Sequence, residues 1–436
     1  MAQDVVAEVD FDVIVIGGGV AGTVCAYQLA KAGKQVVLIE RGEQPGSKNL
    51  SGGVFYCRVM EQVFPNFVKE APIERQITRN VLSFLNPTSH FNIDYWDQRL
   101  AEPVNAVTVL RAKLDVWLSE QCEAAGVMVM PSVRVDSLLF DGDQVVGVKA
   151  GQDELHAHVV VAADGVNSFI AQEAGIRVKE ANKHLAVGVK SVIGLPQKVI
   201  EDRFGVTGNE GVAYAVVGDC TQTVAGGGFL YTNKESVSVG VVLRLDDLEA
   251  KGLKSSEVHD HFLQHPAIAP LLRDGELLEY GCHLTIEDGP KMSSHDITRP
   301  GLIIIGDAAG FTLNTGLTIR GMDLAAGSGI AAAKTIVGAL ERGEYSQHAM
   351  DDYKYQLDAS FVGADMKTYA KAPDFLDVSR MYKEYGLLLA DIFHDIYNLD
   401  TTPRKHVAAT ALGAFGRSNL KLTTTIGDAL KAARAL

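Results

Sequence analysis

A glycine-rich turn between two apolar segments constrains the fold of this chain more than any other feature. Residues 12–16 read Asp-Val-Ile-Val-Ile, a pattern typical of a buried parallel strand, and Gly17-Gly-Gly-Val-Ala-Gly22 follows directly. A helix is predicted from Thr23 to Lys31, and a second apolar strand at 35–39 leads to Glu40. The order strand, glycine turn, helix, strand and acid predicts a Rossmann-type nucleotide site.

Each glycine of the G-x-G-x-x-G spacing in this unit has a physical role. Gly17 permits the tight turn, Gly19 lets the backbone approach a pyrophosphate, and Gly22 lets helix and strand pack closely. The free N–H groups at the helix start favour phosphate. Glu40 can accept hydrogen bonds from ribose hydroxyls. The unit therefore predicts an ADP-containing dinucleotide; the alternative is a glycine-rich turn without a ligand.

Two later strand ends favour FAD over NAD. Residues 159–163 form an apolar run that ends at Asp164-Gly165, and residues 301–305 form another that ends at Gly306-Asp307. Ligands of doubly wound sheets bind beyond the carboxyl ends of the strands, where an aspartate can hold a ribityl hydroxyl. Either aspartate taken singly could instead be an ordinary strand-end cap.

A long Ala/Gly-rich helix is predicted from about 317 to 340. Its start, with Gly316, Leu317 and Thr318, would face the flavin and stabilise negative charge on the reduced ring. Arg320 is a candidate cation for the same purpose, and a salt-bridged surface arginine is the alternative. No side chain is predicted to act as a catalytic acid or base.

These motifs resemble the FAD-binding fold shared by p-hydroxybenzoate hydroxylase, geranylgeranyl reductase and electron-transfer-flavoprotein:quinone oxidoreductase. In that fold an arginine opens a mid-domain helix, and Arg111 stands in such a place within 109–118. Three further segments, at 46–53, 227–233 and 318–324, are similar to the FixC family, the flavoproteins of FixABCX (EtfABCX) complexes. The resemblance covers the whole chain.

The resemblance implies that the chain binds one FAD. Together with the motifs above it assigns as cofactor-binding residues Gly17, Gly19, Ala21, Gly22, Glu40, Arg41, Ser51, Gly52, Gly53, Arg111, Val135, Asp164, Gly165, Gly306, Asp307, Gly316 and Leu317.

The resemblance also implies partners. A FixA/FixB-type electron-transfer flavoprotein would deliver electrons, quinone would accept them at the membrane, and a FixX-type ferredoxin-like protein would carry an iron–sulfur cluster. Electron bifurcation would link quinone reduction to a low-potential ferredoxin or flavodoxin, an output that often serves nitrogenase. The five cysteines lack cluster spacing, so any cluster would belong to a separate partner.

Composition excludes several classes of protein. With 40 Lys and Arg against 54 Asp and Glu, the formal charge is −14, and no basic cluster predicts nucleic-acid binding. No stretch approaches 18 apolar residues, so we expect no transmembrane helix. The scattered cysteines and the acidic first ten residues favour a cytoplasmic protein that contacts the membrane only peripherally. No metal site is predicted.

The expected fold class is α/β. A discontinuous Rossmann-like FAD domain of the hydroxylase/glutathione-reductase type is expected at 1–53, 105–183 and 288–345. A β-rich quinone or substrate domain is expected at 54–104 and 184–287, where residues 211–217, 227–231 and 236–243 alternate with period two. A helical region at 346–436 would contact a partner or the membrane surface.

Two helical segments carry open alternatives. The apolar residues of 382–397 are typical of a packed core helix, and a quinone channel or membrane-surface helix is the alternative. His259, His261 and His265 lie in a predicted helix, where their spacing favours a solvated face over a metal site.

Three other functions remain open from the sequence. The first is a geranylgeranyl-reductase-like reductase of isoprenoid double bonds. The second is an aromatic hydroxylase, which is disfavoured because Gly310 and Asn314 stand where that class usually has His and Pro. The third is a flavin-bearing scaffold for complex assembly.

Overall fold

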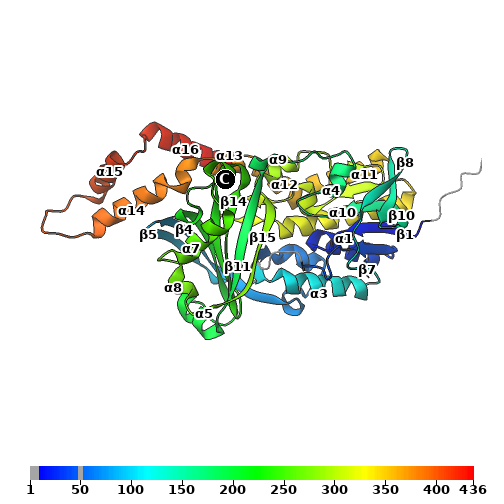
Figure 1. Ribbon diagram of the computed structural model, residues 1–436, viewed down its shortest axis with the longest axis horizontal. Coiled ribbons are helices and arrows are strands. Elements are labelled where there is room, and N and C mark those ends of the chain that lie inside the picture. Colours follow the sequence, from blue (N-terminus) through cyan, green and yellow to red (C-terminus); the bar gives the residue numbers. More distant parts are fainter. Residues whose placement is uncertain (1–8, 48–52) are drawn as a thin grey trace, which may run out of the picture.

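The computed structural model describes residues 9–47 and 53–436. It has two large sheets and one two-stranded sheet, with helices packed around the first large sheet and a helical C-terminal extension beyond the second (Figure 1). The first sheet has the order β16 (Thr298–Arg299), β17 (Leu302–Ile304), β10 (Asp153–Ala162), β1 (Phe11–Ile16), β2 (Val36–Ile39), β7 (Met128–Met130). In addition, β9 (Gln144–Ala150) pairs with β10, and β8 (Ser137–Asp141) pairs with β9.

The first sheet is parallel through its centre. Val13 of β1 lies opposite Val159 of β10 on one side and Val36 of β2 on the other. These β-branched side chains are buried, as expected for a parallel sheet covered on both faces. The covering helices are α1 (Val20–Lys31), α3 (Arg111–Ala124), α4 (Phe169–Glu173), α10 (Met322–Arg342), α11 (Gln347–Asp358) and α12 (Phe361–Thr368).

Helices α1 and α10 pack closely because α10 carries a glycine at the contact. A Cβ on Gly329 would lie 2.6 Å from the carbonyl oxygen of Ala21, closer than any side chain allows. The small residues of α10 therefore bring its first turns next to the β1–α1 turn.

The second sheet is mostly antiparallel. Its order is β15 (Glu276–Ile286), β11 (Leu185–Gly194), β14 (Ser236–Arg244), β13 (Gly226–Thr232), β12 (Glu210–Gly218), β4 (Ile73–Asn86), β6 (Ala106–Val109), β3 (Gly53–Tyr56), with β5 (Ser89–Trp96) paired to β4. The three alternating segments correspond to β12, β13 and β14. The helices near this sheet are α2 (Phe67–Glu70), α5 (Gln197–Phe204), α6 (Leu245–Lys251), α7 (Ser255–Gln264), α8 (Ala269–Leu272) and α9 (Gly289–Met292).

The C-terminal extension begins with α13 (Ala372–Leu376) and continues through α14 (Glu384–Tyr397), α15 (Val407–Arg417) and α16 (Leu422–Ala435). In Figure 1 α14 and α15 project away from the sheets. Helices α11 and α12, by contrast, contribute Met350, Tyr353 and Val362 to the core of the first sheet. The packing thus changes near residue 370, whereas the expected helical region began at 346.

Three sequence-based expectations need correction. The Ala/Gly-rich helix starts at Met322, not near Leu317, because residues 313–320 form a short hairpin of β18 (Leu313–Asn314) and β19 (Ile319–Arg320). Helix α14 buries only Gly386, so it is not a core helix. Helix α7 is not a fully solvated helix, because His259 and Phe262 pack against the second sheet.

The histidines of this region have separate partners. His261 contacts Asp219 at 2.7 Å, and His265 contacts the carbonyl of Asn86 at 2.8 Å. Within residues 9–47 and 53–436, no group of three or more His, Cys, Asp or Glu is arranged to hold a metal ion. None of the helices described there is long and apolar enough to cross a membrane.

Candidate functional site

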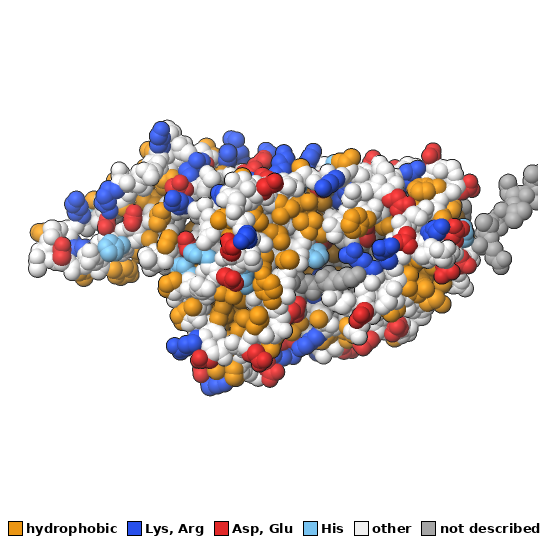
Figure 2. Space-filling model, viewed as in Figure 1, with side chains coloured by type: hydrophobic (Ala, Val, Ile, Leu, Met, Phe, Trp, Pro, Cys, Tyr) orange, Lys and Arg blue, Asp and Glu red, His pale blue; other side chains and the backbone are white. Residues whose placement is uncertain are grey.

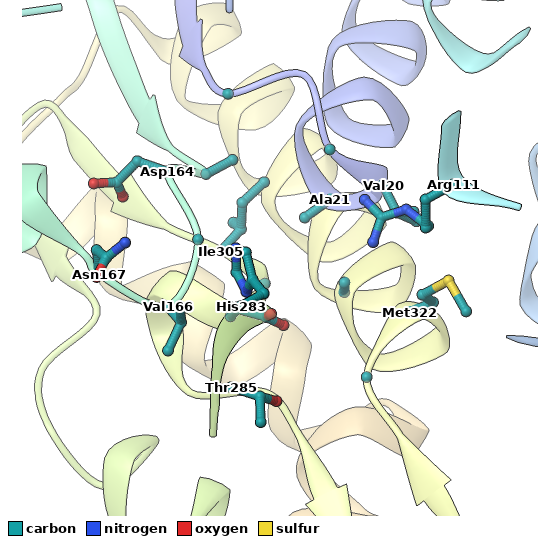
Figure 3. Close-up of a pocket in the computed structure, with 18 of the residues that line it drawn as sticks. Val20, Ala21, Arg111, Asp164, Val166, Asn167, His283, Thr285, Ile305 and Met322 are labelled. Carbon is teal, nitrogen blue, oxygen red and sulfur yellow. The ribbon is translucent and has the colours of Figure 1, made fainter. Parts of the chain in front are cut away.

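A cavity of about 820 Å³ lies between the carboxyl ends of the parallel strands and one face of the second sheet. Figure 3 shows Arg111 and Met322 on one side of it, Asp164 and Asn167 on the other, and His283 between them. The cavity thus combines loops of the first sheet with strands of the second. Its volume falls in the usual range for small-molecule and cofactor sites.

The β1–α1 turn forms one end of the cavity. Gly17 has φ +109°, and a Cβ there would lie 2.3 Å from the carbonyl oxygen of Ala163. A Cβ on Gly22 would lie 2.0 Å from the carbonyl oxygen of Gly17. Gly19 is different, because the nearest atom to its Cβ position is the Arg111 guanidinium at 3.7 Å. Gly17 and Gly22 are needed for the turn itself, while Gly19 leaves open space above the start of α1.

Glu40 closes the same turn from the end of β2. Its Oε2 accepts a hydrogen bond from the N–H of Gly18 at 2.9 Å, and its Oε1 accepts one from Gly42 at 2.6 Å. The carboxylate therefore fixes the glycine turn and also lines the cavity. A carboxylate has further lone pairs with which to accept ribose hydroxyls.

Arg111 is held at the cavity by the first turn of α3. Its Nε and Nη2 each lie 2.7 Å from the carboxylate of Asp115, whose side chain is fully buried. This bidentate ion pair fixes the plane of the guanidinium, which suits recognition of an anion.

Asp307 lies on the 3-10 turn that follows β17. Burial raises the pKa of Asp307, while Arg111, His283 and a hydrogen bond with Thr312 act to lower it. A carboxylate beside the Arg111 guanidinium in a cavity is suited to a hydrogen-bonding role toward a polyol.

Asp164 follows the end of β10 on the opposite side of the cavity. Its Oδ2 accepts a hydrogen bond from the N–H of Ile170 at 3.0 Å, and its Oδ1 is shielded from solvent yet has no hydrogen-bond partner among the described residues. Burial raises the pKa of Asp164. Ser168 donates a hydrogen bond to the carbonyl of Ala308 at 3.0 Å, which ties this loop to the one that carries Asp307.

The second sheet supplies a wall of the cavity whose individual side chains the sequence did not single out. Phe229 and Tyr231 of β13 stack with ring centroids 5.1 Å apart and planes 19° apart. Val242 of β14 and His283 and Thr285 of β15 line the same wall. The period-two pattern of 227–231 predicts a strand with two alternating faces. It does not indicate which of the two faces meets the cavity.

Arg320 lines the cavity from β19, but two carboxylates hold it. Its Nη2 lies 2.6 Å from Asp323 and its Nη1 lies 2.5 Å from Asp365. The guanidinium also lies over the ring of Phe361 at 5.7 Å. Arg320 is therefore salt-bridged and at the same time part of the cavity lining.

The cavity brings together most, but not all, of the predicted cofactor residues. Those that line it are Gly17, Gly19, Ala21, Glu40, Arg41, Gly53, Arg111, Val135, Asp164, Gly165, Gly306, Asp307 and Arg320. Gly22 lies behind the turn. Ser51 and Gly52 lie outside the described residues. Gly316, Leu317 and Thr318 are at the tip of the hairpin, outside the lining, and the Leu317 side chain is 63% exposed.

The residues present fit FAD. Gly17 and Gly22 admit no side chain, Gly19 leaves open space above the start of α1, and that start has no side-chain cap for its N–H groups. One buried oxygen of Asp164 has no hydrogen-bond partner among the described residues. These features suit a pyrophosphate and polar sugar chain. The aromatic and apolar wall of the second sheet suits a flat ring system.

Comparisons with known proteins agree with this fit. A family model described as an FAD binding domain matches residues 10–207. The probable electron transfer flavoprotein-quinone oxidoreductase YdiS of Escherichia coli K12 is 42% identical over 427 residues, which cover 98% of this chain and 99% of that protein. The protein FixC of Salmonella typhimurium is 42% identical over 92% of each chain.

Among solved structures, a geranylgeranyl bacteriochlorophyll reductase-like protein from Thermoplasma acidophilum superposes with a TM-score of 0.69 at 20% identity. The match covers 96% of this chain and 98% of that one. The flavin-dependent brominase Bmp2 superposes with a TM-score of 0.63 at 16% identity, over 97% of this chain and 98% of the brominase. These structural similarities show only that this chain shares the fold of the two proteins.

The fold, the FAD-binding family model and the relatives together define an FAD-dependent oxidoreductase, which confirms the predicted fold class and cofactor. Within that class, the chain belongs to the family of FixC and the electron transfer flavoprotein-quinone oxidoreductases, so its FAD serves electron transfer.

Proposed function

We propose that this protein accepts electrons from a FixA/FixB-type electron-transfer flavoprotein and passes them to a membrane quinone. The observation that carries the proposal is the cavity's construction, with a dinucleotide cradle at one end and the stacked Phe229 and Tyr231 on the facing wall. The names of its relatives supply the donor and the acceptor.

FAD would be held by the residues that line this cavity. The β1–α1 turn would face the pyrophosphate, Glu40 would bind the adenosine ribose, and Asp307 would bind the ribityl chain. When bound, FAD supplies reversible uptake and release of electrons. The protein's own task is to orient the cofactor and to shield it from water.

A separate FixX-type protein would carry any iron–sulfur cluster. Four of the five cysteines are buried at scattered positions in the described structure. Burial raises the pKa of Cys57 to about 11 and that of Cys122 to about 12, which disfavours the thiolate that a cluster needs. We further propose a FixABCX-type assembly that bifurcates electrons to quinone and to a low-potential ferredoxin or flavodoxin, linked to nitrogen fixation, on the basis of the FixC relatives.

The C-terminal helices would supply peripheral contact with the cytoplasmic face of the membrane. Leu412 of α15 and Leu422, Ile426 and Leu430 of α16 are more than half exposed. Residues 401–436 contain six Lys or Arg and a single Asp, against the acidic balance of the whole chain. Figure 2 shows basic side chains gathered along these helices at the upper left. Exposed leucines beside basic residues favour the surface of an anionic bilayer.

Anaerobic stopped-flow absorbance at the flavin band tests the function. The purified protein is mixed with a reduced FixAB-type flavoprotein and then with a soluble quinone. We expect the flavin to be reduced in the first step and reoxidised in the second. A folded, yellow protein that fails in both steps would contradict the proposal. Saturation of a prenyl chain by the isolated protein would instead favour an isoprenoid reductase.

A further inference from the structure

Lys190 lies on the face of the second sheet that meets the cavity. In the strand register Lys190 of β11 is opposite Gly240 of β14, and Gly240 is opposite Phe229 of β13. On its other side Lys190 is opposite Gly281 of β15. Residues directly opposite one another share a face of the sheet. Because Phe229 lines the cavity, Lys190 belongs to the same face of the sheet, although Lys190 itself is not one of the residues that line the cavity.

The glycine at position 240 makes room for this lysine. A Cβ on Gly240 would lie 2.6 Å from Cζ of Phe229 and 3.0 Å from Cα of Lys190. Without a side chain at Gly240, the lysine and the ring come together, and Nζ lies 5.9 Å from the centroid of Phe229. Lys190 is only 2% exposed. The sheet thus holds an amine next to the ring that forms the cavity wall.

The charged surroundings of Lys190 come from several elements. Glu279 and His283 of β15 and Tyr231 of β13 share its face, and Arg111 of α3 acts on it electrostatically. His259 of α7 packs against the opposite face, where it contacts Ser191. Burial lowers the pKa of Lys190 to about 7, with Glu279 acting to raise it and Arg111 to lower it. A buried amine that titrates near neutrality is uncommon outside functional sites.

We propose that Lys190 supplies a proton to the quinone during its reduction in this cavity. The proposal rests on the proposed function. Reduction of a quinone to a quinol consumes two electrons, which arrive from the donor flavoprotein by way of the FAD site, and two protons. The Lys190 ammonium gives one proton and becomes a neutral amine. Solvent supplies the second proton and later restores the ammonium.

The test separates acceptors that need protons from those that do not. The variants are Lys190→Met, Lys190→Arg and, as a matched control, Lys198→Met on the exposed side of α5. Each protein is reduced anaerobically with dithionite, and its reoxidation is followed by stopped flow between pH 5.5 and 8.5. One series uses a soluble quinone. The other uses ferricenium, which takes one electron and no proton.

We expect wild-type reoxidation by quinone to slow as pH rises through about 7, because the ammonium is the proton donor. Lys190→Met should be slower with quinone by roughly 100-fold at pH 6 and should lose this break, since a positioned proton donor contributes about 10²-fold or more. Its reoxidation by ferricenium should be unchanged. Lys190→Arg keeps the charge but does not release a proton, so it should be as slow as Lys190→Met.

Two outcomes would contradict the role of Lys190 while leaving the proposed function intact. One is a Lys190→Met protein with wild-type quinone rates and pH profile. The other is rescue of the quinone rate by Lys190→Arg, which would assign Lys190 a purely electrostatic role. If Lys190→Met does not retain FAD, the pH dependence of reoxidation by quinone in Lys190→Arg decides whether Lys190 is the proton donor. A wild-type protein that reacts with ferricenium but not with quinone would overturn the proposed function and this role together.

Discussion

At the scale of single residues, the glycines of the β1–α1 turn have different structural roles. Gly17 and Gly22 are required by the chain itself, since a Cβ on either would overlap a backbone oxygen. The Cβ position of Gly19 is open, with nothing nearer than 3.7 Å. Substitution at Gly19 therefore separates cofactor binding from folding, which substitution at Gly22 cannot do.

We predict that Gly19→Val yields a folded protein without FAD. The added side chain would occupy the space above the start of α1, where the pyrophosphate is expected. Released flavin and circular dichroism measure the two properties independently. Ala32→Val, at the exposed far end of the same helix, is the matched control and should retain FAD. Full FAD occupancy in Gly19→Val would refute the assignment of this turn.

Glu40→Ala should weaken FAD binding by about 1–2 kcal/mol, the usual scale for hydrogen bonds to a charged group. The loss has two sources in the structure, because the carboxylate also accepts the N–H groups of Gly18 and Gly42. Isothermal titration of the apoprotein with FAD measures the change. Glu40→Gln keeps an acceptor oxygen and should lose less; equal losses would indicate that charge alone matters.

At the scale of elements, the segment before α10 is a hairpin because its side chains satisfy the turn. Asn314 accepts a hydrogen bond from the N–H of Gly316 at 2.8 Å, and Thr315 accepts one from Thr318 at 3.0 Å. Gly316 has φ +77°, which a helix does not permit. The helix then begins after Gly321. This hairpin carries Arg320 to the cavity and leaves Leu317 in solvent.

Arg320→Gln should lower the midpoint potential of the bound flavin. The substitution removes the cation between Asp323 and Asp365, so uncompensated negative charge would oppose reduction. A change of order 30 mV is expected, since that corresponds to about 1.4 kcal/mol for a two-electron couple. Spectroelectrochemical titration measures it. Adding Asp323→Asn should restore part of the potential, and Leu317→Ser should leave it unchanged.

At the scale of the whole molecule, the C-terminal helices form an extension rather than part of either core. Phe393 of α14 packs against Phe91 of β5 with centroids 5.1 Å apart, and Asn86 donates a hydrogen bond to the carbonyl of Gly386. A bidentate ion pair between Arg380 and Asp428 anchors α16. These few contacts attach the extension firmly while its outer apolar side chains stay exposed.

The double variant Leu412→Glu/Leu430→Glu should keep its FAD and its reduction by the donor flavoprotein but bind vesicles at least tenfold more weakly. Charged side chains at the contact face would oppose insertion into the headgroup region. Flotation with phosphatidylglycerol-containing vesicles measures binding. Tyr355→Glu, at an exposed position of α11, is the control and should bind as the wild type does. Unchanged flotation of the double variant would argue against membrane contact by these helices.

Much of the FAD cradle could be predicted from sequence because its signals are local. The glycine spacing, Glu40, Asp164 and Asp307 each follow directly from a strand within a few residues. The start of α10 was predicted about five residues too early, since helix propensity alone did not reveal the side-chain hydrogen bonds of the hairpin. Helix α14 was open to two interpretations because an apolar stripe does not say what covers it.

The sequence by itself determined the Rossmann-type unit, the FAD cofactor and the family, because short-range spacing and motif identity carry that information. Only the tertiary structure decided which face of the second sheet meets the cavity, that Arg320 is shared by two carboxylates, and that Lys190 lies beside Phe229. The physical reason is strand register. Pairing between β11, β13, β14 and β15 joins residues up to about 100 positions apart, and no local pattern specifies which of them become neighbours.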